Sequence, residues 1–175
     1  TEIPKGIDGI TTLLDFYLSA ISQQIEHRLS LDPNRKIVDR AIEKFIEKSI
    51  SLKSSYLPIT DAVSCFDAIL PSSGRESDSL LRQLEHEGLI TVEPVYIEEF
   101  ENSEDCVRFT FERISDYRIA SHLLKEHIEA KHSLEKFQSG SPLHDFLGNE
   151  HLYLRAGVVD ALSVILPEKY GVELP

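Results

Sequence analysis

The order of patterns between residues 60 and 112 constrains the fold more than any other feature of this chain. Apolar residues at three- and four-residue intervals predict a helix over 61–70 and a second helix over 79–87. Gly88 follows directly, at the position where many helices end in the left-handed conformation. Two runs that alternate as strands do come next. The segment is therefore expected to form two short helices followed by an antiparallel hairpin.

The expected hairpin spans about Leu89 to Glu112, with the polar residues 101–105 at its tip. Pro94 lies within the first run and favours an edge strand, since proline cannot donate a ladder hydrogen bond. In the second run, alternation places three residues inward: Val107, Phe109 and Phe111. Helix, turn, helix and hairpin is the winged-helix order, and the phrase LLRQLEHEGLI is similar to the second helix and first wing strand of many such domains.

The rest of the chain has helical periodicity. Amphipathic helices are predicted over 9–30, from Asp32 to about Ser51, from Ser115 to about Ile128, and over 150–166. Asp32 and Ser115 are the candidate N-caps of their helices. We therefore expect a mainly α fold in which helical bundle elements flank a winged-helix domain with a small antiparallel β-hairpin.

This pattern divides the chain into three expected domains. They are a helical segment over 1–57, a winged-helix domain over 58–114 and a C-terminal helical segment over 115–175. Without a methionine, Thr1 is not a natural translation start, so the chain is interpreted as a piece excised from a larger protein.

The negative charge of the chain is concentrated in its middle segment. The formal net charge is −12, and residues 61–112 hold thirteen acidic residues against Arg75, Arg82 and Arg108. Because DNA affinity depends on cations placed against phosphates, this segment is not expected to bind nucleic acid. A winged helix used for protein–protein packing fits the charge better.

Motifs of catalysis are missing from the sequence. It contains no phosphate loop GxxxxGK[ST], no GxGxxG, no HExxH and no CxxC, so the chain by itself predicts no enzyme, no cofactor and no metal site. Cys65 and Cys106 are interpreted as small buried hydrophobic residues. With no apolar run of membrane length and no signal peptide, a cytoplasmic location is expected.

One phrase resembles a known family. Residues 107–124, VRFTFERISDYRIASHLL, are similar to the junction after the winged helix in STAND-class NTPases, closest to the NACHT-like bacterial ATP-binding proteins that include the AVAST antiphage group. The phrases LDPNRKIVDRAI, ILPSSGRESDSLLRQLEHEGLI and LPEKYGVEL extend the resemblance over most of the chain. It implies a regulatory module that packs on the ATPase core of a larger parent and relays the state of that core. The implied partners are the ATPase core and sensor domains of the same parent, which would bind ATP or ADP with Mg and could form an oligomer.

The resemblance also implies site residues. In many relatives a histidine near the end of the last wing strand contacts the nucleotide phosphate, and Phe111 stands at that position here when Asp116 is matched to the acidic residue of the motif. This departure puts the phosphate contact in doubt. Arg113 is the nearest cation that could substitute in the parent, and an ion pair with Asp116 or Glu112 is the structural alternative. Phe111 and Asp116 are the expected interface residues.

Two functions thus remain open. One is the regulatory module of a STAND NTPase, with a role in signal transduction and antiphage defence implied by the resemblance. The other is a free-standing winged-helix transcription regulator or adaptor protein whose flanking helices dimerise.

Overall fold

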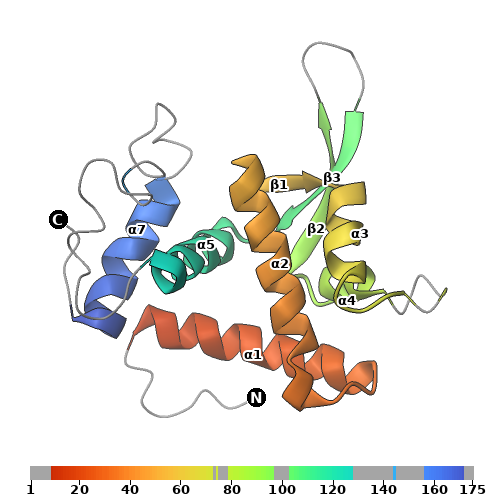
Figure 1. Cartoon of the computed structure of the whole chain (residues 1–175), viewed down its shortest axis with the longest axis horizontal. Coiled ribbons are helices and arrows are strands. Elements are labelled where there is room, and N and C mark those ends of the chain that lie inside the picture. Colours follow the sequence, from red (N-terminus) through yellow and green to blue (C-terminus); the bar gives the residue numbers. More distant parts are fainter. Residues whose placement is uncertain are drawn as a thin grey trace. The chain divides into compact units, whose positions relative to one another are not determined.

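In the computed structural model the chain is mainly helical, with a small three-stranded antiparallel sheet (Figure 1). The structure describes residues 9–72, 74, 79–96, 103–127, 144 and 156–171. It has two packing units, one of residues Leu18–Phe111 and one of Thr1–Tyr17 with Glu112–Pro175. The boundary near residue 17 falls within the first helix, α1, which spans Ile10–Arg28.

The Leu18–Phe111 unit contains the sheet. After the second half of α1 it consists of a 3-10 turn (η1, Pro33–Arg35), α2 (Ile37–Leu52), β1 (Tyr56–Pro58), α3 (Ile59–Asp67), α4 (Leu80–His86), β2 (Ile90–Tyr96) and β3 (Ser103–Phe109). The strands lie in the order β1-β3-β2, and α3 and α4 pack against them (Figure 1).

The register of the sheet follows from the hairpin that the sequence predicts. β2 and β3 pair from Ile90 opposite Phe109 to Tyr96 opposite Ser103, and Pro94 lies on an edge strand as expected. On its other side β3 pairs with β1, where Leu57 lies opposite Val107. The sequence pattern missed β1, because three residues are too few to display alternation.

Aromatic rings form the centre of the core in this unit. Phe45 of α2 stacks on Phe66 of α3 with 5.8 Å between ring centroids, and meets Phe109 of β3 edge-on at 5.6 Å. All three are at most 2% exposed, and Val107 is fully buried beside them in β3. The inward orientation predicted for Val107 and Phe109 is confirmed.

The same prediction was wrong for Phe111. β3 ends at Phe109, so the alternation of the strand no longer applies two residues later, and Phe111 is 57% exposed. The next helix, α5 (Glu112–His127), begins three residues before the predicted Ser115 cap. Arg113 therefore lies in the first turn of a helix rather than in a linker.

Of two helix ends predicted from single residues, the structure confirms one, at Gly88, and contradicts the other, at Asp32. Gly88 has φ +69° and donates to the Glu85 carbonyl, ending α4 as expected. Asp32, in contrast, accepts from the Asn34 amide and caps the 3-10 turn, not α2. Lys36, at φ 48°, separates that turn from α2.

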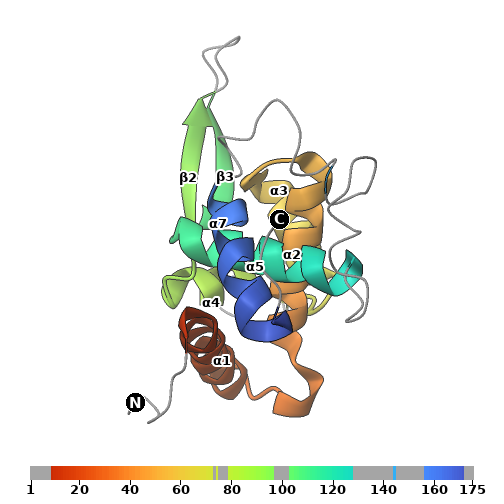
Figure 2. The same ribbon diagram turned by 90° about the vertical axis from the view of Figure 1, so that its left-hand side faces the viewer.

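The other unit combines the first half of α1 with α5, α7 (Ala156–Ile165) and a π-helical turn, η5, over Leu166–Tyr170. Helix α7 packs across α5 (Figure 2), and Leu124 of α5 and Val158 and Leu162 of α7 are buried. The helix predicted to end at 166 continues as this π turn, which contains Pro167 and ends at Gly171 with φ 65°. The predicted start of this helix at 150 lies outside the described residues.

These units differ from the three domains expected from the sequence. The expected boundary between 57 and 58 falls inside the unit Leu18–Phe111, because β1 joins the sheet directly after α2. The boundary between 114 and 115 lies three residues from the break between Phe111 and Glu112.

Candidate functional site

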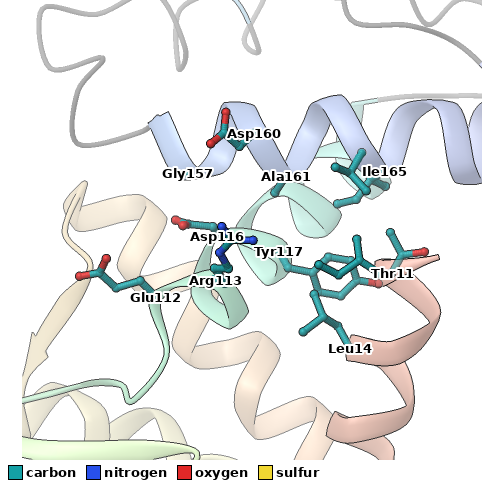
Figure 3. A pocket seen from close by; sticks show the side chains of 12 residues that line it. Thr11, Leu14, Glu112, Arg113, Asp116, Tyr117, Gly157, Asp160, Ala161 and Ile165 are labelled. Atoms are coloured by element: carbon teal, nitrogen blue, oxygen red, sulfur yellow. The ribbon is translucent and has the colours of Figure 1, made fainter.

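A pocket of about 290 Å³ lies within the unit formed by Thr1–Tyr17 and Glu112–Pro175 (Figure 3). Three helices supply the walls of this pocket. The lining residues are Ile10, Thr11 and Leu14 of α1; Glu112, Arg113, Asp116 and Tyr117 of α5; and Gly157, Asp160, Ala161, Val164 and Ile165 of α7.

Two of the three site residues expected from the sequence line this pocket together. Arg113 and Asp116 lie on the first turns of α5, and Figure 3 shows their side chains next to each other. Phe111 is not among the lining residues and is exposed. The contact between Arg113 and a nucleotide in a parent protein stays a prediction.

Asp116 is half-buried, and its pKa is raised from 3.8 to about 6. Burial is the largest cause of this rise, the negative charges of Glu112 and Asp160 contribute to it, and the positive charge of Arg113 opposes it by a smaller amount. The electrostatic potential at the Asp116 carboxylate is therefore dominated by its acidic neighbours.

Gly157 permits the close approach of α7 to Asp116. A Cβ atom added at Gly157 would lie 2.0 Å from Oδ2 of Asp116, far inside any real contact distance. Glycine is thus required here for space and not for an unusual backbone angle. Without it, the carboxylate could not occupy the wall of the pocket.

Tyr117 joins the pocket to a polar cluster. Its hydroxyl donates to Oδ1 of Asp15 at 2.6 Å, and Nζ of Lys169 donates to the Tyr117 hydroxyl and to Oδ2 of Asp15, both at 2.9 Å. The Lys169 ammonium also lies 5.4 Å from the centre of the Tyr117 ring. Burial and the hydrogen bond to Asp15 raise the pKa of the Tyr117 hydroxyl, so this group stays protonated at neutral pH.

Among the described residues, no group of three or more His, Cys, Asp or Glu is placed to hold a metal ion. Likewise, no helix in the described part of the chain is long and apolar enough to cross a membrane. Cys65 and Cys106 are both buried and unpaired, and burial raises the pKa of each thiol.

Several lining residues escaped the sequence analysis. Tyr117, Gly157 and Asp160 come from segments that looked like ordinary amphipathic helix, and their roles arise only where α5 and α7 meet. A glycine within a helical pattern was the one local signal, since it is tolerated there for packing reasons.

Comparison with known proteins gives no relative: no family model matches the chain, and no curated protein or solved structure matches it significantly.

Proposed function

We propose that this chain is a regulatory module of a larger STAND-class NTPase, in which the unit Leu18–Phe111 is a winged helix that contacts protein and not DNA. The observation that carries the proposal is the order of elements α2-β1-α3-α4-β2-β3 around a sheet ordered β1-β3-β2. Helix, strand, helix, helix and two-stranded wing, with the first strand completing the sheet, is the winged-helix arrangement.

The charges of α4 disfavour DNA. Under this proposal α4, Leu80–His86, corresponds to the recognition helix, which enters the major groove in helix-turn-helix proteins. Its only arginine, Arg82, donates to Glu85 at 2.7 Å, and the nearby Arg28 of α1 pairs with Glu87. Among the described residues, both of these arginines are paired with carboxylates, which disfavours phosphate contacts by this helix.

The wing strands also lack a basic surface. Arg108 of β3 pairs with Glu93 of β2 through its guanidinium, and Glu104 and Asp105 are exposed on β3. This acidic surface repels a DNA duplex but accommodates a protein surface of opposite charge.

Phe111 supplies an apolar anchor for a protein partner. It is the most exposed of the large hydrophobic residues in the described chain, at 57%. Exposed aromatic residues contribute disproportionately to protein interfaces. Under this proposal its partner is the ATPase core or a sensor domain of the parent. The parent would bind ATP or ADP with Mg and act as an oligomer in the cytoplasm.

Titration with labelled duplex DNA tests the first half of the proposal. Fluorescence anisotropy near physiological salt, with a basic winged-helix protein as positive control, should show no saturable binding by this chain. Micromolar binding that weakens steeply with salt would overturn the proposal and support the alternative, a free-standing transcription regulator.

Nucleotide exchange in the intact parent tests the second half. Phe111→Ala and Arg113→Ala should each change the rate of ADP release, since both sit at the junction expected to face the core. Glu47→Gln, at an exposed residue of α2, is the matched control and should leave the rate unchanged. A parent without a phosphate loop, or equal exchange rates in all variants, would contradict the proposal.

A further inference from the structure

We infer that the pocket between α1, α5 and α7 binds a small organic cation, an ammonium or guanidinium group carried on an apolar body. The inference goes beyond the proposed function, because it rests on the unit formed by Thr1–Tyr17 and Glu112–Pro175 and on none of the winged-helix elements.

The first argument is the size and lining of the pocket. A volume of about 290 Å³ corresponds to roughly ten water molecules, enough for a six-membered ring or a short alkyl chain with a polar head. Most of the wall is apolar, from α1 and α7: Ile10, Leu14, Ala161, Val164 and Ile165. An apolar cavity with a few charged groups at one side is the usual form of a small-molecule site.

The second argument is the sign of the charge. Three carboxylates, those of Glu112, Asp116 and Asp160, line the pocket against the single guanidinium of Arg113. Asp116 responds more strongly to the two acidic neighbours than to Arg113, so the local potential is negative despite the arginine. A cationic head therefore gains attraction here, while a phosphate or carboxylate meets net repulsion.

The third argument concerns the kind of cation. Because the carboxylates do not form a metal-holding group among the described residues, a compact metal ion would contact too few of them. An organic cation can reach one or two carboxylates with its hydrogen-bond donors while its apolar part covers Ala161 and Ile165. The ammonium of Lys169 does not fill this role, since it is held by Asp15 and Tyr117.

Binding can be measured by NMR on the isotope-labelled full chain at about pH 7.5, where Asp116 is ionised. The probe is benzylammonium; benzyl alcohol and benzoate are its neutral and anionic counterparts. We expect benzylammonium to shift the signals of Leu14, Ala161 and Ile165 saturably, with a dissociation constant of about 1–10 mM. Benzyl alcohol should bind more weakly, and benzoate weakest of all.

Charge variants separate a specific site from surface adhesion. Asp160→Asn and Asp116→Asn should each weaken benzylammonium binding about 2- to 5-fold, and Arg113→Gln should strengthen it by a similar factor. Glu104→Gln removes the same charge from the other unit and should leave the affinity unchanged. The amide spectrum of each variant verifies that it remains folded.

Three results with the probes would overturn the inference. They are preferential binding of benzoate, equal binding of benzylammonium and benzyl alcohol, and no saturable shift up to about 50 mM benzylammonium. Equal weakening by Asp160→Asn and by Glu104→Gln would also overturn it, because it would show that only the net charge of the chain matters.

Discussion

Glu168 accepts a hydrogen bond of 2.5 Å from the hydroxyl of Thr11, a residue 157 positions earlier in the sequence. The same carboxylate lies 3.4 Å from the Thr11 amide, in the first turn of α1. Gly9, at φ +144°, leaves room for it, because a Cβ there would come within 2.5 Å of Glu168. The π-helical turn near the end of the chain thus caps the helix at its beginning.

Removing this cap should destabilise the unit that contains both residues, Thr1–Tyr17 with Glu112–Pro175. A double-mutant cycle of Thr11→Val and Glu168→Ala should give a coupling free energy of about 1 kcal/mol, the usual magnitude of an N-cap hydrogen bond. Urea denaturation of the four proteins measures it. Thr12→Val, on the exposed neighbour of Thr11, is the control and should cost less than about 0.5 kcal/mol. Additive effects of the two substitutions would show that the contact contributes nothing.

Gly157→Ala should destabilise the protein, although alanine is normally the better residue in a helix. The new Cβ would lie 2.0 Å from Oδ2 of Asp116, and overpacking of this kind costs about 1–3 kcal/mol. Thermal unfolding should show a lower Tm for the single variant. In the Asp116→Ala background the clash is gone, so the same substitution should become neutral or stabilising. Stabilisation in the wild-type background would contradict the packing of α7 on Asp116.

The raised pKa of Asp116 predicts a pH dependence of stability. A carboxyl group with a folded pKa of about 6 and an ordinary value of 3.8 holds its proton more tightly when folded. The contribution of Asp116 to the free energy of unfolding is therefore most favourable below about pH 4, and it is lost as the pH rises through about 6. The shift corresponds to at most about 3 kcal/mol, and solvent screening of a half-exposed group reduces the expected effect to about 1 kcal/mol.

The substitution Asp116→Asn tests this pH dependence, because it removes the titrating carboxyl group. The variant should match the wild type near pH 4 and exceed its free energy of unfolding by about 1 kcal/mol at pH 7.5. Urea titrations between these pH values provide the difference curve. A difference independent of pH would exclude Asp116 as the titrating group.

Phe109 and Phe111 form a matched pair for testing the core. Phe109→Ala removes a ring that is 2% exposed and in edge contact with Phe45, and should cost about 3–5 kcal/mol. Phe111→Ala, at a residue 57% exposed, should change stability by less than about 0.5 kcal/mol. Chemical denaturation of both variants is the measurement. Comparable losses would mean that Phe111 is buried and that β3 extends beyond Phe109.

Much of the architecture could be predicted because its signals are local. Helical periodicity located α1, α2 and α4, Gly88 located the end of α4, and alternation located β2 and β3. β1 could not be found this way, since a three-residue strand exists only through its hydrogen bonds to β3. The start of α5 was displaced for a related reason, because Ser115 is a good cap in isolation but lies inside the helix.

The sequence by itself determined the helical class, the hairpin and the acidic character of the middle segment, all of which depend on residues close together in the chain. It also singled out Arg113 and Asp116, which share the first turns of one helix. Only the tertiary structure decided that these residues line one pocket with Gly157 and Asp160, and that Glu168 caps α1. Such relationships join segments tens to more than a hundred residues apart, and the packing of whole helices, not the propensity of any segment, brings them together.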